Sequence, residues 1–242
     1  MGDGFKSLDC PVFWICKAVN VLLDIVKSYV GMIKDDKLRV MVSEFLVDPP
    51  AGFDAPSLPL EICPAGAFQH HCYTGGLVEH TASMVRIALT LCDIVEEYYG
   101  GELDRDVVIA SSILHDLMKC YCYEEAEGGG YRGSDFGGHV DHLSLMVGEM
   151  MNRGFPIAVV HAVAGHHGDI GPTKPKSLEA LIVSLADLVD SELNSKLLRA
   201  AEYLLRRCGI SKPRVLSSRE AVDIVVAKDH DGWEGVRKII NE

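Results

Sequence analysis

The chain has 242 residues, a hydrophobic content of 48% and a formal net charge of −12. It is long enough to bury a sizeable core, and its charge argues against a broad basic surface of the kind that binds nucleic acid. The apolar stretch over residues 12–30 is interrupted by Lys17, Asp24 and Lys27, which excludes an unbroken membrane span of about 20 apolar residues. The eight cysteines contain no C-x-x-C pair, so we expect free thiols and a soluble, cytoplasmic protein.

Helical periodicity begins in the first part of the chain. Apolar residues recur three and four positions apart over residues 12–30 and 38–47, which predicts two helices. Asp48-Pro49-Pro50 ends the second helix, because proline lacks the backbone N–H that a helix interior needs. A connection that contains proline and glycine then runs to about Gly76.

The next two predicted helices carry polar groups on apolar faces. The first places His80 on the same face as its apolar residues, so we expect the imidazole to point toward the interior. The second begins at Asp104, a suitable N-cap residue, and runs to Met118. His115-Asp116 lies near its end and offers a nitrogen and an oxygen ligand from one piece of backbone. Such a pair can chelate a divalent cation when further ligands arrive from other helices.

The second half of the chain is also predicted to be helical. Residues 124–138 contain six glycines, so no regular element is expected there; the segment is either a mobile lid or a surface insertion. Helices are predicted over about 139–152, 156–166 and 177–207. The tail from about residue 212 is expected to form a short strand or turn and one or two small helices that pack on the main domain. The expected fold class is all-α, without an internal repeat.

Histidine and aspartate side chains recur along these helices. Nine of the ten histidines lie between positions 70 and 167, and Asp187 lies within the apolar stretch LIVSLADLVD. Burying such groups is costly unless they are paired or bound to a metal. A hydrogen-bonded core residue is the alternative for any one of them, but several together favour a metal site. Asp190, one turn after Asp187, is interpreted as a surface partner.

The spacing of the remaining histidines leaves alternatives open. His139 and His142 are three apart and share a helix face. His166 and His167 point about 100° apart on a helix, so one is expected to face His139 while the other contacts substrate or a second ion. Two divalent ions clamp a phosphoryl group and lower the pKa of a bridging water, which suits phosphoester hydrolysis. Lys119 either holds a substrate phosphate or is a solvated lysine at a helix end.

On these residues the chain resembles the HD-domain superfamily of metal-dependent phosphohydrolases, and within it the HD domain of bacterial 3′–5′ exoribonucleases. The similarity covers roughly residues 25–195 and includes the blocks HHCYTGGLVEHTASM, LDRDVVIASSILHDLMK, AGHHG and LEALIVSLADLVDSELN. It implies an HD-domain helical bundle over residues 51–208. N-terminal helices over 1–50 would pack on this core, and residues 209–242 would form a C-terminal extension.

The resemblance also implies roles for individual residues. One or two divalent ions, of manganese, iron, nickel, cobalt, zinc or magnesium, would be held by a set of imidazole and carboxylate groups: His80, His115, Asp116, His139, His166, His167 and Asp187. Asp116, as the bridge, and Lys119 are the expected catalytic residues, and His139 is preferred to His142 as a ligand. The side chains expected to contact substrate are His70, His71, Lys119 and His142, with at least one of the HH pair at the rim of the site.

The predicted function is a divalent-metal-dependent phosphohydrolase, in which a metal-bound hydroxide cleaves a phosphate ester of a nucleotide or short oligonucleotide. The expected partner is a phosphorylated small molecule or a short oligonucleotide, without membrane association. One alternative is a 3′–5′ exonuclease on single-stranded RNA or DNA, and another is a nucleotide-binding sensor with a degenerate site. Met118 stands where the exoribonucleases have glycine, and only helices are expected before residue 50, where those enzymes carry an OB-type module. Both departures fall where substrate choice would be decided.

Overall fold

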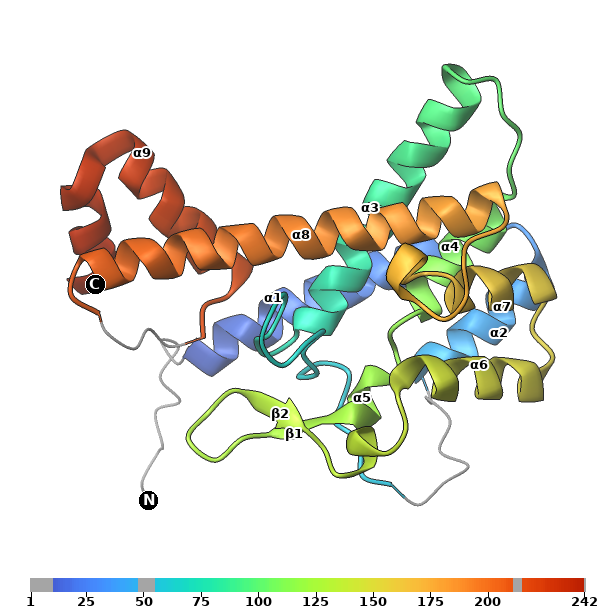
Figure 1. Ribbon diagram of the computed structural model, residues 1–242, viewed down its shortest axis with the longest axis horizontal. Helices are drawn as coiled ribbons and strands as arrows, with labels where there is room; N and C mark the ends of the chain where they lie inside the picture. The colour runs from blue at the N-terminus through green and yellow to red at the C-terminus, as the bar shows by residue number, and fades with distance from the viewer. Residues whose placement is uncertain (1–10, 48–54, 211–214, 242) are drawn as a thin grey trace, which may run out of the picture.

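The structure of the chain is a computed structural model that describes residues 11–47, 55–210 and 215–241. The described part is mostly helical (Figure 1), which confirms the all-α prediction. None of its helices is long and apolar enough to cross a membrane. In chain order its elements are α1 (Pro11–Val30), α2 (Asp36–Val47), α3 (Gly76–Glu97), α4 (Arg105–Leu114), α5 (Lys119–Cys122), β1 (Tyr123–Glu125), β2 (Tyr131–Gly133), the 3-10 turn η1 (Phe136–Gly138), α6 (His142–Arg153), α7 (Ile157–Ala164), η2 (Gly168–Ile170), α8 (Leu178–Arg207) and α9 (Ser218–Asn241).

Helices α3, α4 and α8 form the centre of the fold. The long helix α8 packs against α3, α4, α7 and α9, while α1 and α2 cover α3 and α4 (Figure 1). The main core joins α1–α4 and α6–α8, and side chains such as Val85, Ile113 and Met146 are fully buried in it. Each such side chain stabilises the fold by roughly 1.5–3 kcal/mol relative to exposure. This packing fixes the relative positions of the polar groups that the same helices carry.

The HD pair lies on a turn and not inside a helix. Asp104 caps α4 as predicted, since its side chain accepts hydrogen bonds from the N–H groups of Asp106 and Val107. The helix ends at Leu114, four residues earlier than expected, and Asp116 falls in the turn before α5. The backbone N–H of Lys119 donates to the Asp116 carbonyl at 2.9 Å and closes this turn. The side chains of His115 and Asp116 both reach the same cluster of polar groups, with Asp116 Oδ2 3.3 Å from His115 Nε2.

The glycine-rich segment forms a β-hairpin, so the expectation of no regular structure there was wrong. Strands β1 and β2 pair antiparallel with Glu124 opposite Arg132. The connection contains Gly128, Gly129 and Gly130, each with a φ between 78° and 97°. Glycine adopts these backbone angles without steric cost, so the three residues reverse the chain instead of disordering it.

The tail forms one element, α9, which packs against the C-terminal part of α8. Gly232 interrupts it with a non-helical conformation, so α9 consists of two helical stretches, in line with the expected small helices. Leu198 and Leu205 of α8 and Ile224 of α9 are buried together in a second core. No strand is present over residues 215–241, while residues 211–214 and the predicted helix stop at 48–50 lie outside the described residues.

Candidate metal centre

Ligand-type side chains from three helices meet where α3, α4 and α8 pack together. His80 of α3, His115 at the end of α4 and Asp187 of α8 bring ligand atoms within 4.8 Å of one another. His80 Nε2 lies 3.1 Å from His115 Nε2 and 3.3 Å from Asp187 Oδ1. Asp116 Oδ2 lies 3.3 Å from His115 Nε2 and 3.5 Å from His80 Nε2. The structure thus brings together four of the predicted ligands, namely His80, His115, Asp116 and Asp187.

A second group of ligand atoms adjoins the first through Asp116. It consists of His142 at the start of α6 and of His166 and His167 after α7, whose ring nitrogens also lie within 4.8 Å of one another. Asp116 Oδ1 lies 3.2 Å from His142 Nε2 and 3.7 Å from His166 Nε2. The two oxygens of one carboxylate therefore face different groups of histidines, an arrangement suited to a carboxylate that bridges two ions.

The hydrogen bonds of the cluster leave metal-binding atoms unsatisfied. His115 and His166 each donate Nδ1–H to the backbone carbonyl three residues earlier, at 2.9 and 2.7 Å, so each turns an Nε2 lone pair toward the cluster. Asp116 Oδ1, His142 Nε2 and His166 Nε2 are buried and lack a hydrogen bond of good geometry. Buried polar atoms without partners are rare and costly. A bound divalent cation would satisfy all three, so the residues present fit a metal site.

Burial and neighbouring charges set the protonation of these groups. Burial lowers the pKa of His166 to about 3 and lowers that of His167 as well, which keeps both rings neutral. Burial alone would raise the pKa of Asp116, but the charges on His115 and Lys119 hold it well below its usual range. Neutral imidazole and ionised carboxylate are the forms that coordinate metals. His166, His167 and Asp116 are therefore in the forms that coordinate a metal. Burial alone would lower the pKa of His80, but its contacts with Asp116, Asp187 and Asp190 raise it well above its usual value, so this ring would release its Nε2 proton when a metal binds.

His139 lies outside both groups. It is exposed, and its Nδ1 lies 2.9 Å from the carbonyl oxygen of Asp135. His142, which was ranked behind His139 as a ligand and named as a possible substrate contact, occupies the position beside Asp116. Helix α6 begins three residues later than predicted, after the N-cap Asp141, so the side chain that faces the cluster is one turn further along. The geometry therefore does not support the preference for His139.

The adjacent histidines at positions 70 and 71 lie in different environments. His70 lines the pocket next to the cluster, with its ring centroid 5.4 Å from that of His80, and burial lowers its pKa to about 4. His71 is buried behind His80, with Nε2 2.8 Å from Asp190 and Nδ1 2.7 Å from the Tyr73 hydroxyl. The geometry thus places one member of the pair at the rim, and it does not support contact between His71 and substrate.

The role of Asp190 was missed by the sequence analysis, which placed this residue at the surface. The residue is buried, and its Oδ2 accepts a hydrogen bond from His80 Nδ1 at 2.7 Å. Asp190 lies three residues after Asp187 on α8, and residues three apart share a helix face. That spacing was the signal that could have placed both carboxylates beside His80.

A pocket of about 510 Å³ opens beside the ligand groups. Its lining includes an apolar wall formed by Leu181, Leu185 and Leu188 of α8, together with the ligand-type residues His166, His167 and Asp187. Among the described residues that line the pocket, Lys119 is the sole lysine or arginine. Its side chain is buried and its Nζ lies 2.5 Å from Asp116 Oδ2, so it is not a solvated lysine.

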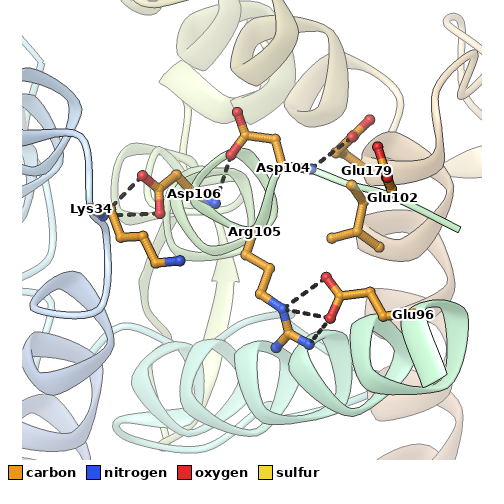
Figure 2. Close-up of a pocket in the computed structure, with 8 residues that line it drawn as sticks. Lys34, Glu96, Glu102, Asp104, Arg105, Asp106 and Glu179 are labelled. Atoms are coloured by element: carbon orange, nitrogen blue, oxygen red, sulfur yellow. Dashed lines mark hydrogen bonds and ion pairs between the residues drawn. The ribbon is translucent and has the colours of Figure 1, made fainter.

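A larger pocket, of about 750 Å³, lies at the start of α4 and has a different character (Figure 2). Its lining is mostly acidic, but four of its five carboxylates have structural partners among the described residues, Glu102 being the exception. Asp106 accepts hydrogen bonds from the backbone N–H groups of Lys34 and Asp35, and Figure 2 shows Arg105 reaching Glu96. None of the close groups of metal-ligand atoms in the described part of the chain lies here. We interpret this pocket as a junction between elements.

Comparisons with known proteins agree with the site. Residues 77–192 match the HD domain family, a span that contains both ligand groups. Over 203 residues the chain is 41% identical to the dihydroneopterin 2′,3′-cyclic phosphate phosphodiesterase of Methanocaldococcus jannaschii, which covers 83% of this chain and 81% of that protein. The chain belongs to the HD-domain phosphohydrolases. As a member of this family it is a hydrolase of phosphate esters, and the HD domain together with the two ligand groups implies divalent metal binding.

More distant HD-domain relatives are bacterial ribonucleases. The chain is 26% identical over 186 residues to the 3′-5′ exoribonuclease YhaM of Bacillus subtilis, with 72% of this chain and 55% of that protein covered. It is 31% identical over 140 residues to the enzyme of the same name from Oceanobacillus iheyensis, with coverage of 54% and 43%. The chain thus spans about half the length of these exoribonucleases. No solved structure gives a significant match.

Proposed function

We propose that this chain is a divalent-metal-dependent phosphodiesterase that acts on a small phosphate ester of the nucleotide type, with a cyclic phosphate as the first candidate. The observation that carries the proposal is the pair of ligand groups that share Asp116 at one end of a pocket of about 510 Å³. The relative from Methanocaldococcus jannaschii, named for its action on a cyclic phosphate, adds support.

The proposed ligand sets follow the two groups. One ion would be held by His80, His115, Asp116 and Asp187, and a second by Asp116, His142, His166 and His167. Divalent ions in such a site polarise phosphoryl oxygens and lower the pKa of a water molecule, which provides a nucleophile at neutral pH. Mixed imidazole and carboxylate ligation suits manganese, iron, cobalt, nickel or zinc.

Lys119 and His70 are the proposed contacts to the substrate phosphate. Lys119 is buried in the pocket wall and paired with Asp116, so its ammonium group can accept a second anionic partner without leaving its position. His70 lines the same pocket with a buried Nδ1 that has no hydrogen-bond partner. A neutral ring there can donate to or accept from a phosphate or ribose oxygen.

The lining of the pocket favours a small substrate over a nucleic-acid strand. Its volume lies within the usual range for small-molecule sites. Grooves that follow a single strand carry several basic side chains, whereas this pocket offers only Lys119 among the described lining residues and includes Asp169 and Glu192. Leu181 and Leu185 are 44% and 41% exposed and present an apolar wall. We infer that this wall receives the ring of the substrate while its phosphate lies at the ligand groups.

A substrate panel tests this proposal. The purified protein would be assayed on 2′,3′-cyclic and 3′,5′-cyclic nucleotides, mononucleotides and short oligoribonucleotides, each with Mn²⁺, Mg²⁺, Co²⁺ or Ni²⁺. We expect the highest kcat/KM on a cyclic phosphate. Preferred cleavage of oligonucleotides from the 3′ end, with binding that weakens steeply as salt rises, would identify an exonuclease instead. Recovery of an intact bound nucleotide in the presence of metal would identify a sensor.

The matched variant for this panel is Asp116→Ala. Because one oxygen of Asp116 faces each ligand group, its loss should remove bound metal and reduce phosphodiesterase activity to background. Metal content would be measured by elemental analysis of the same sample. A fully active Asp116→Ala protein without metal would contradict the proposed site.

A further inference from the structure

A hydrogen-bonded carboxylate lies directly behind His80. Asp190 Oδ2 accepts from His80 Nδ1 at 2.7 Å and from His71 Nε2 at 2.8 Å. Its other oxygen accepts from the Ser83 hydroxyl at 2.6 Å. Since a carboxylate only accepts, Nδ1 of His80 carries a proton, and Nε2, which faces Asp187 and His115, is the nitrogen left to bind a metal. Asp190 thus selects the tautomer of His80 that can bind a metal.

The hydrogen bonds continue from His71 to the C-terminal helix. Because His71 donates through Nε2, its neutral ring accepts from the Tyr73 hydroxyl at Nδ1, and Tyr73 in turn contacts the Ser218 hydroxyl. Asn194 of α8 closes a second path, since its Oδ1 accepts from the His71 backbone N–H at 2.7 Å and its Nδ2 donates to Ser218 Oγ at 2.7 Å. Ser218 is the first residue of α9. A continuous chain of buried and half-buried hydrogen bonds therefore joins Ser218 of α9 to His80.

The backbone holds His71 in a conformation that its side chain alone would not favour. Its φ is 43°, in the left-handed region that residues other than glycine rarely adopt. The His71 carbonyl accepts from the Ala65 N–H at 3.0 Å, and a Cβ at Gly76 would approach that carbonyl oxygen to 2.0 Å. Such strain persists where the surroundings determine the conformation, and it often marks functional sites. The backbone contacts around His71 therefore hold the residue in a conformation that it would rarely adopt alone.

We propose that Asp190, His71, Tyr73, Asn194 and Ser218 form a positioning network that sets the tautomer and orientation of His80 and makes α9 part of the metal centre. These residues act through His80 and do not contact substrate. The inference rests on the proposed function only in taking His80 as a ligand. The family match ends at residue 192, and no residue of α9 lines the pocket. The inference therefore gives α9 a role in the metal centre that neither observation indicates.

The variants that test the network interrupt it at different distances from His80. Asp190→Asn removes the negative charge next to His80 and replaces one of the two accepting oxygens by an NH2 donor. Tyr73→Phe removes one hydroxyl in the middle of the network, and Ser218→Ala removes the hydroxyl at its end on α9. The matched control is Ser217→Ala, because the hydroxyl of Ser217 forms a capping box with Glu220 at the start of α9 and bonds no member of the network. The control therefore weakens the start of α9 without breaking the connection to His80.

Each full-length variant would be stripped of metal and titrated with Mn²⁺ by calorimetry, and its apo thermal midpoint and its kcat and KM would be measured. We expect Asp190→Asn to lower Mn²⁺ affinity roughly 10- to 100-fold, as loss of an outer-shell partner of a ligand does. We expect Tyr73→Phe and Ser218→Ala to lower it less, with kcat reduced and KM unchanged. Ser217→Ala should lower the thermal midpoint and leave Mn²⁺ affinity at the wild-type value.

The outcomes separate this inference from the proposed function. Wild-type Mn²⁺ affinity in Tyr73→Phe and Ser218→Ala would overturn the network, and these two variants decide the matter even where Asp190→Asn does not fold. An equal loss of affinity in Ser217→Ala and Ser218→Ala would also overturn it, because the effect would then follow helix stability alone. Absence of Mn²⁺ binding in the wild-type protein would instead contradict the proposed function.

Discussion

The pocket at the start of α4 is larger and more acidic than the pocket beside the ligand groups, yet it has the weaker claim to chemistry. In the acidic pocket Asp106 and Glu179 accept from backbone N–H groups and Glu96 accepts from Arg105, and each of these bonds joins two segments of the fold. Beside α8, in contrast, Asp116 Oδ1 and two imidazole nitrogens are buried without good partners. Burial of unsatisfied ligand atoms, more than volume or charge, therefore distinguishes the candidate site from a structural junction.

The electrostatics of the two pockets differ in the same way. The Arg105 guanidinium beside Glu96 lowers the pKa of that exposed carboxyl, so the pair neutralises itself. Around His80, the carboxylates of Asp116, Asp187 and Asp190 are opposed by Lys119, which is the one lysine or arginine among the described residues that forms an ion pair with any of them. A divalent cation would balance this excess of negative charge, whereas nothing comparable remains to be balanced at the start of α4.

Metal removal is expected to have the largest effect on activity, because it empties the ligand groups and leaves the acidic pocket unchanged. After treatment with a chelator, we expect phosphodiesterase activity to fall to background and to return when Mn²⁺ is added back. A ligand present at 100 times its Kd stabilises a folded protein by about 2.7 kcal/mol, so the thermal midpoint should fall on removal and recover with the ion. Activity and calorimetry on the same samples check this. Full activity with no metal detectable would contradict a metal centre.

The next largest effect on activity is expected when His142, and not His139, is replaced by alanine. His142→Ala removes a nitrogen 3.2 Å from Asp116, and we expect kcat/KM to fall roughly 100-fold or more. His139→Ala is the matched control, because His139 is exposed and bonds only a nearby carbonyl; its kcat/KM should stay within about twofold of wild type. Steady-state kinetics at saturating Mn²⁺ distinguish the two. The reverse order of effects would restore the original preference for His139.

The leucine wall should contribute to binding more than to the chemical step. Leu185→Ala removes an apolar contact worth roughly 1–1.5 kcal/mol, so KM for a cyclic nucleotide should rise by up to about tenfold with kcat little changed. Leu193→Ala is the control, since Leu193 is a more exposed leucine of the same helix that does not line the pocket. Equal KM values for the two variants would show that the ring of the substrate does not lie on this wall.

The smallest effect on activity is expected in the acidic pocket. Asp106→Ala removes the acceptor for two backbone N–H groups in the segment before α2, which should lower the free energy of unfolding by about 1 kcal/mol and leave kcat/KM unchanged. Glu102→Ala serves as the control, because Glu102 lines the same pocket and its carboxylate forms no hydrogen bond or ion pair with the described residues. Denaturant unfolding measures the difference. Loss of activity in Asp106→Ala at full stability would assign chemistry to this pocket.

Several features could be predicted because they depend on local pattern. Helical periodicity, the N-cap Asp104 and the inward face of His80 are properties of neighbouring residues, and the structure has them. The HD pair and Asp187 were placed together because buried polar groups require partners. Family resemblance and physical reasoning agreed on these positions, and the geometry brings them together.

Other features depend on long-range contacts that periodicity does not report. The start of α6 is set by the cap at Asp141, and a shift of three residues exchanged His139 for His142. The burial of Asp190 depends on His71, which is 119 residues away in sequence and approaches only because the backbone at Gly76 leaves room for it. The hairpin over 123–133 was missed because its glycines were taken to exclude a regular element. The positive φ angles of Gly128, Gly129 and Gly130 instead form its turn.

Helix α8 has 30 residues without interruption, which corresponds to a rod about 45 Å long. Along that rod lie the leucine wall, the carboxylate of Asp187 and the surface that receives α9. Because a helix transmits displacement as a rigid body, these three features keep a fixed register, and none can shift alone. Substitutions at the wall positions would therefore change which ring is accepted while leaving the ligand atoms in place. Among related proteins with this helix, substrate preference can therefore change through substitution of a few side chains on one face of α8, while the metal ligands stay the same.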